Sequence, residues 1–200
     1  MDRLLALARR IARIGAWFGG LLMIASALLV GVEVVIRKAF NLTIGGADEL
    51  SGYALAISTS WALAFALLER AHIRIDSLYV HLPVRLAALL DLLGLALFSG
   101  FIGLVAWYGF GVFQTSYDLD AHSLSPLSTP LVVPQLLWMA GFVMFLGVAA
   151  PLLLRSLMAF VAGDLHTVQR LIGSRSVSEE LEAELAELER AGRKSMDGPR

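Results

Sequence analysis

Residues 131–154 read LVVPQLLWMAGFVMFLGVAAPLLL, and no side chain in this run is charged. A helix needs roughly 20 apolar residues to cross a hydrocarbon layer of ~30 Å, so this run is long enough to span a membrane. The whole chain has the same character: 58% of its 200 residues are hydrophobic and 16% are charged, with a mean hydropathy of +0.73. The sequence therefore predicts an integral membrane protein.

Three more apolar runs predict three further spans, at about residues 16–36, 50–68 and 86–113. We expect an all-α membrane protein whose transmembrane domain covers residues 16–160. A basic amphipathic lead-in precedes it at residues 1–15, and an acidic tail follows at residues 161–200. The tail carries a narrow seam of leucines, which fits either a short solvated helix or a coiled-coil contact.

Lys and Arg predict the orientation of these spans. They gather in the lead-in, in the connection 69–85 and after residue 154, whereas the connection 114–130 has none. This pattern places both termini in the cytoplasm. Arg37 and Lys38, which follow the first span, are the exception.

Few charged residues lie near or within the spans. Glu33 precedes Arg37 by four residues, the spacing of an intrahelical ion pair. We interpret Glu33 as a structural or subunit-contact residue, with a coupling-ion carboxylate as the alternative. Asp48 and Glu49 suit the positive end of the second helix, and Asp91 is expected to have a structural role.

The connection 69–85 alternates charged and apolar residues. This pattern predicts an interfacial segment whose apolar side faces lipid, while Arg70, Arg74 and Arg85 face phosphates. Asp76 could cap a short turn ahead of Pro83, which begins the third span.

Small residues recur at four-residue spacing, which lets helix backbones approach closely. The pairs are Gly15 and Gly19, Ala27 and Gly31, Ala96 and Gly100, and Ser99 and Gly103. Trp61 and the hydroxyl residues before it, at mid-span, indicate another packing face.

The sequence lacks the residues that several kinds of catalytic or cofactor site require. The chain has no cysteine, which removes thiolate nucleophiles and cysteine-ligated metals. All four histidines lie outside the predicted spans, which argues against a membrane haem, and neither a phosphate-binding loop nor a zinc-protease motif occurs. With a net charge of -1, nucleic acid is not an expected partner. We therefore predict no catalytic, cofactor-binding or metal-binding residue, and no enzyme.

Two short motifs carry a resemblance to a known family. Residues 47–56 read ADELSGYALA, and residues 71–76 read AHIRID. This pair, within a four-span pattern, resembles the small permease subunits of tripartite ATP-independent periplasmic (TRAP) transporters, the DctQ-like family, over about residues 15–160. Asp48 and Glu49 match the first motif, and His72, Arg74 and Asp76 match the second.

The resemblance implies a scaffold subunit in a bacterial inner membrane. Its implied partners are a large permease subunit, a periplasmic substrate-binding protein and membrane phospholipids, and the implied activity is sodium-coupled import of a carboxylate solute. Nine residues are then expected at structural, partner or lipid interfaces: Glu33, Arg37, Asp48, Glu49, Arg70, His72, Arg74, Asp76 and Arg85. A stand-alone proton-coupled carrier and a membrane electron-transfer anchor are the alternatives.

Overall fold

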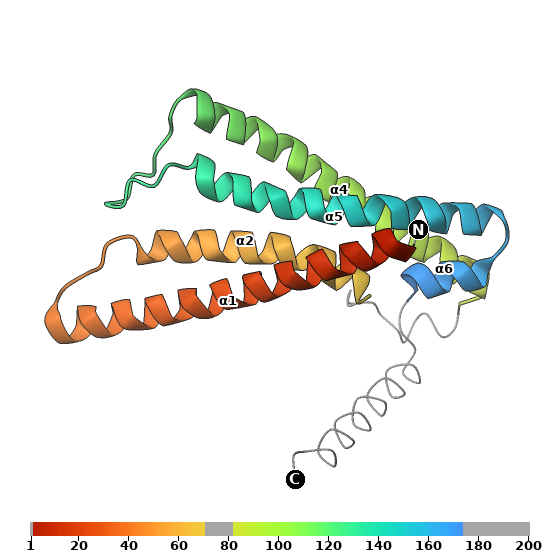
Figure 1. Cartoon of the computed structure of the whole chain (residues 1–200), viewed down its shortest axis with the longest axis horizontal. Coiled ribbons are helices and arrows are strands. Elements are labelled where there is room, and N and C mark those ends of the chain that lie inside the picture. Colours follow the sequence, from red (N-terminus) through yellow and green to blue (C-terminus); the bar gives the residue numbers. More distant parts are fainter. Residues whose placement is uncertain (1, 71–81, 174–200) are drawn as a thin grey trace, which may run out of the picture.

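The computed structural model describes residues 2–70 and 82–173 of the chain. The described chain folds into five helices (Figure 1). These are α1 (Asp2–Phe40), α2 (Ala47–Leu68), α4 (Val84–Asp118), α5 (Val132–Val161) and α6 (Leu165–Ile172). The first four are long and apolar enough to cross a membrane, so the predicted all-α protein with four spans is confirmed. Most of the predicted interfacial segment and most of the acidic tail lie outside the described residues.

The helices are longer than the predicted spans. Residues 2–40 form one continuous helix of 39 residues, with no break between the lead-in and the first span. At 1.5 Å per residue, such a helix is about 58 Å long, so it extends well beyond a hydrocarbon layer of ~30 Å. Pro83 is the residue before α4, as the sequence predicts, because its fixed φ suits a helix start.

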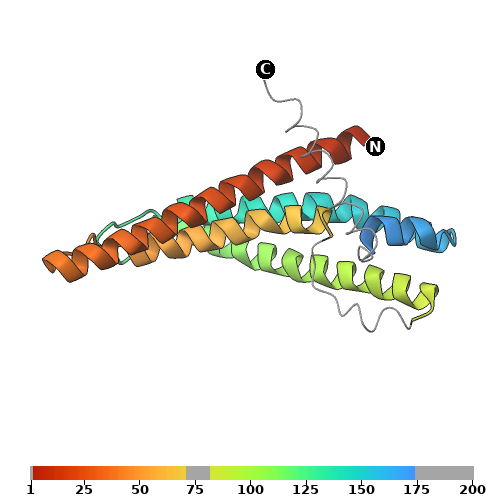
Figure 2. The same ribbon diagram turned by 90° about the horizontal axis from the view of Figure 1, so that it is seen from below.

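The four long helices form an open row in the order α1, α2, α5, α4. In this row α1 packs on α2, α2 on α5, and α5 on α4, while α1 and α5 share only a small contact. Figures 1 and 2 show the row from two directions. A row buries less helix surface than a closed bundle. In the most apolar window of α1 only 11% of the residues are buried, against 28–33% in the other three spans.

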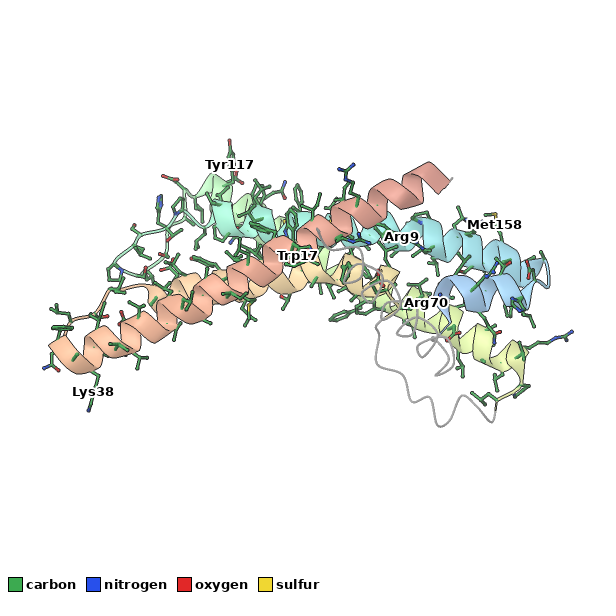
Figure 3. The ribbon with its side chains drawn as sticks, turned by 60° about the horizontal axis from the view of Figure 1, so that its bottom comes forward. Arg9, Trp17, Lys38, Arg70, Tyr117 and Met158 are labelled. Atoms are coloured by element: carbon green, nitrogen blue, oxygen red, sulfur yellow. The ribbon has the colours of Figure 1, made fainter. Side chains whose placement is uncertain are left out.

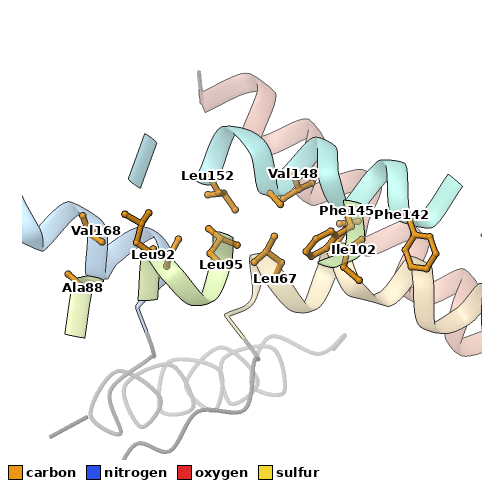
Figure 4. Close-up of a cluster of buried hydrophobic side chains, with 14 residues drawn as sticks. Leu67, Ala88, Leu92, Leu95, Ile102, Phe142, Phe145, Val148, Leu152 and Val168 are labelled. Carbon is orange, nitrogen blue, oxygen red and sulfur yellow. The ribbon is translucent and has the colours of Figure 1, made fainter. Parts of the chain in front are cut away.

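The four long helices have two ends, and α6 lies at one of them, which we call the α6 end of the row (Figure 1). The buried core lies toward this end (Figure 4). There α4, α5 and the end of α2 interlock, and the rings of Phe98 and Phe145 meet edge to face at 5.2 Å. The short helix α6 folds back onto α4 and α5 and buries Val168 and Ile172. We did not predict this helix within the tail. Its first turn is capped by Asp164, whose side chain accepts a hydrogen bond from the N–H of Thr167.

Close helix packing depends on two glycine contacts. A Cβ on Gly141 of α5 would lie 2.7 Å from the carbonyl carbon of Ser60 on α2, and a Cβ on Gly19 of α1 would lie 3.2 Å from the Cα of Ser58. Both glycines therefore let backbones approach more closely than a side chain would permit. By contrast, a Cβ on Gly31 would meet nothing within 4 Å.

The predicted small-residue pairs thus divide into two groups. Gly15 and Gly19 pack against α2, as expected. Gly31, Gly100 and Gly103 face open space within the described chain. At these three glycines no helix of the described chain packs closely, because the helices form a row and leave these faces uncovered. Packing of these faces onto a larger partner stays a prediction.

Candidate functional site

The strongest polar cluster lies at the end of the row opposite α6, where two loops meet. We define the loop cap as residues 41–46, between α1 and α2, together with residues 119–131, between α4 and α5. One carboxylate lies beside each loop: Glu33 holds the first loop through hydrogen bonds, and Glu49 faces the hydroxyl groups of the second.

Glu33 is 3% exposed, and both of its carboxylate oxygens accept hydrogen bonds. Its Oε1 accepts from Arg37 Nη2 at 2.7 Å and from Thr43 Oγ1 at 2.7 Å. Its Oε2 accepts from the backbone N–H of Ile44 at 2.8 Å. The structure thus contains the ion pair that the spacing predicts, and adds two donors from the loop. A buried charge needs such partners, since leaving it unpaired is costly.

Glu49 lies in the first turn of α2, where the helix dipole favours a negative charge. Its Oε1 accepts a hydrogen bond from the hydroxyl of Tyr53 at 2.7 Å. The hydroxyl groups on the other loop that face the carboxylate belong to Ser123, Ser125 and Thr129. Asp48, its neighbour in the motif, is exposed. Only the second carboxylate of the acidic pair therefore points into the fold.

The α4–α5 loop is ordered by its own hydrogen bonds. The N–H of Ser123 donates to the carbonyl oxygen of Thr129 at 2.9 Å, and the N–H of Thr129 donates to Ser123 Oγ at 3.0 Å. His122 and Pro130 form an isolated antiparallel β-bridge. This loop is a narrow hairpin-like structure, and Glu49 lies against its hydroxyl groups.

The two loops also touch through apolar contacts. Gly46, which precedes α2, has a φ of 102°, and a Cβ at this position would overlap Leu127 of the other loop. Gly45 lies beside Pro126. Glycine is needed at position 46 for two reasons. A residue with a side chain would be strained at this positive φ, and the side chain would displace Leu127.

The other predicted interface residues that the structure describes, Arg70 and Arg85, lie at the opposite end of the row. Arg70, just after α2, is half-buried, and Arg85, in the first turn of α4, is exposed. Asp91 is 3% exposed and has an interaction partner. His72, Arg74 and Asp76 lie outside the described residues, so their predicted roles stay predictions.

At mid-depth, the polar groups of α2 are used in helix packing. The hydroxyl of Ser58 donates to the carbonyl oxygen of Gly19 at 2.9 Å, and the indole N–H of Trp61 donates to that of Leu137 at 2.8 Å. The hydroxyl of Ser60 donates to Ile57 of its own helix. This confirms the predicted packing face. Within residues 2–70 and 82–173, no group of three potential metal ligands occurs.

Sequence reasoning missed the residues that complete the cluster, namely Tyr53 of α2 and the loop residues Thr43, Ile44, Ser123, Ser125 and Thr129. A signal for some of them existed. The run 122–130 is rich in Ser and Thr, and these hydroxyl groups commonly satisfy carboxylates and loop backbones. Tyr53 follows Glu49 by four residues on the same helix, so that pair could have been read from spacing. The pairing of the loop residues with Glu33 and Glu49 could not, because it joins segments that are separate in the sequence.

Four apolar helices in a row, with polar groups concentrated at the row's ends, define a multi-pass membrane protein. Residues 26–159 match the family described as the DctQ component of tripartite ATP-independent periplasmic transporters. The chain belongs to this family and is a small membrane subunit of a TRAP transporter. No curated protein and no solved structure matches the chain.

Proposed function

We propose that this chain is the fixed membrane scaffold of a sodium-coupled TRAP importer in a bacterial inner membrane. A large permease subunit would carry the solute and the sodium ions, and a periplasmic binding protein would deliver the solute, an organic acid or similar carboxylate. The observation that carries this proposal is the family match over residues 26–159, together with a row in which Ser58 and Trp61, at mid-depth, bond to the neighbouring helices.

The distribution of charge supports the proposed orientation, with both termini in the cytoplasm. Basic residues cluster at the α6 end of the row: Arg9, Arg10, Arg13, Arg70, Arg85, Arg155 and Arg170. Arg37 lies at the loop-cap end, yet its charge is paired with that of Glu33 at 2.7 Å. The positive-inside rule counts Lys and Arg, and the seven arginines at the α6 end outnumber Arg37 and Lys38 at the loop-cap end, so the balance supports this orientation.

The open row supports a partner along its length. Large apolar side chains on α1 and α4 are exposed, among them Leu28 at 65% and Leu97 at 73%. Open glycines such as Gly31, Gly100 and Gly103 lie on these same helices. Such faces fit either lipid or the helices of another subunit, and small residues favour close helix approach.

The loop cap supports contact with the binding protein. Leu124 is fully exposed at the tip of the α4–α5 loop, and Asp118 and Asp120 are exposed beside it. An exposed leucine on a loop held by hydrogen bonds is a ready contact for a soluble partner, since a rigid loop loses little entropy on binding.

Reconstitution tests the scaffold proposal. The chain and a TRAP large permease subunit, co-expressed, are expected to co-purify and to take up solute in liposomes only when both are present with sodium and the binding protein. Solute or proton flux catalysed by this chain alone would overturn the proposal in favour of a stand-alone carrier. Leu124→Glu is expected to reduce uptake without reducing co-purification. Tyr117→Phe, near the same loop, is the matched control.

A further inference from the structure

A groove between α1 and α2 has no part in the scaffold role proposed above. It has a volume of about 410 Å³ and is lined by one residue of α2, Phe65, and by six of α1. The six are Arg13, Ala16, Trp17, Gly20, Leu21 and Ile24. Every lining residue except Arg13 is apolar. Gly20 contributes no side chain to the groove, and a Cβ placed there would meet nothing within 4 Å.

The groove runs along one face of α1. Arg13, Trp17, Gly20 and Ile24 recur at intervals of three or four residues, so they lie on the same side of the helix. From Arg13 to Ile24 the helix rises about 16 Å, close to half of a hydrocarbon layer of ~30 Å. When Arg13 is at headgroup level, Ile24 is therefore near the middle of the membrane.

The polar end of the groove is strongly basic. Arg9 lies one turn before Arg13, and Figure 3 shows Arg9 and Trp17 on α1. Two like charges four residues apart destabilise a helix unless an anion lies between them. Among the described residues, no carboxylate forms an ion pair with Arg9 or Arg13. Trp17 is 77% exposed beside them, as aromatic residues at membrane interfaces are.

We propose that this groove binds one anionic phospholipid from the leaflet at the α6 end of the row. Arg13 and Arg9 bind its phosphate and anionic headgroup, and one acyl chain lies in the apolar groove past Gly20 toward Ile24. Charge complementarity and length favour a lipid over a helix of another subunit, which would bring no phosphate to the arginines. This site is independent of the transport role proposed above.

Native mass spectrometry of the purified full-length chain tests the site. Phosphatidylglycerol and phosphatidylcholine are titrated separately, and binding is compared among wild type, Arg13→Gln, Gly20→Phe and Gly31→Phe. Gly31 is an open glycine of the same helix outside the groove, so Gly31→Phe is the control for added bulk. Thermal unfolding of each variant checks that it is folded.

We expect one tightly retained phosphatidylglycerol in the wild type and in Gly31→Phe. Arg13→Gln is expected to weaken it about fivefold, since an arginine near anionic lipid contributes roughly 1 kcal/mol. Gly20→Phe is expected to abolish retention with an unchanged unfolding midpoint. If Gly20→Phe fails to fold, the comparison of phosphatidylglycerol retention between the wild type and Arg13→Gln still tests the proposal.

Three results would overturn the proposal. The first is equal retention of phosphatidylcholine and phosphatidylglycerol by the wild type. The second is equal loss of lipid in Gly20→Phe and Gly31→Phe. The third is a crosslink to protein instead of to phospholipid, from a photo-reactive residue placed at Leu21 in membranes that contain the assembled transporter.

Discussion

The indole N–H of Trp61 on α2 donates a hydrogen bond to the backbone carbonyl oxygen of Leu137 on α5, with 2.8 Å between the two atoms. The ring of Trp61 also contacts Phe18 of α1, with 5.4 Å between the ring centroids. One side chain on α2 therefore touches both neighbouring helices of the row.

Replacing Trp61 by Phe is expected to destabilise the fold modestly. The ring contact with Phe18 can persist, but the hydrogen bond to Leu137 is lost. Hydrogen bonds between membrane helices contribute about 0.6 kcal/mol on average and at most ~1.7 kcal/mol. Reversible unfolding in mixed micelles measures the change. Trp107→Phe is the control, because Trp107 is 75% exposed, and an equal loss in both variants would contradict the role of the bond.

Gly141→Val is expected to disrupt the contact between α2 and α5. The new side chain would meet the backbone of Ser60, which cannot move aside as a flexible side chain could. Overpacking of this kind costs about 1–3 kcal/mol. Gly147→Val on the same helix is the control, since a Cβ at Gly147 meets nothing within 4 Å. Equal unfolding midpoints for the two variants would show that α2 and α5 are not held at Gly141.

Glu33→Gln is expected to loosen the first loop of the loop cap. A Gln side chain has one acceptor oxygen instead of two, so the N–H of Ile44 and the donors on Thr43 and Arg37 cannot all be satisfied. Amide hydrogen exchange at Ile44 should become faster, while exchange within α5 stays unchanged. Lys38→Gln alters a neighbouring charge outside this cluster and serves as the control. Unchanged protection of Ile44 in Glu33→Gln would rule out the hydrogen-bond anchor.

The start of α6 is expected to depend on pH through Asp164. Hydrogen bonds from the hydroxyl and the N–H of Thr167 lower the pKa of Asp164 below its ordinary value of 3.8. A group whose folded pKa is lowered contributes its full stability above the ordinary value. That stability is lost as the pH falls through the lowered pKa.

Protection of the Thr167 amide, corrected for the intrinsic exchange rate, should therefore fall below about pH 3.8. Asp164→Asn keeps an oxygen acceptor but cannot titrate, and its protection should not change with pH in this range. A parallel fall in the wild type and in Asp164→Asn would assign the effect to other groups.

Much of the fold could be predicted from local pattern, because a membrane span is a long apolar run and its length follows from the lipid layer. The ion pair of Glu33 and Arg37 could be predicted for the same reason, since four residues place both side chains on one helix face. The order of the helices could not. Local periodicity shows that α4 has small residues, yet it does not show whether another helix of the same chain covers Gly100.

The contacts of the loop cap were still harder to predict from the sequence. Glu49 could be placed at a helix start from the sequence, but the hydroxyl groups of Ser123 and Ser125 reach it only through the fold. The helix α6 was overlooked for another reason, because eight residues with one capping aspartate give a weak signal beside an acidic tail.

The row also constrains how the chain is made. Its third span, α4, packs on α5 and α6, both of which are synthesised after it. During translation α4 therefore enters the membrane before its main packing partners exist, beside an α1–α2 hairpin of which only the end of α2 shares a core with it. A nascent chain that stops before Val132 would contain an α1–α2 hairpin and α4, with little packing between them. Synthesis of α5 supplies the helix that packs on both α2 and α4. The incomplete chain is therefore most susceptible to quality-control proteases before α5 is made.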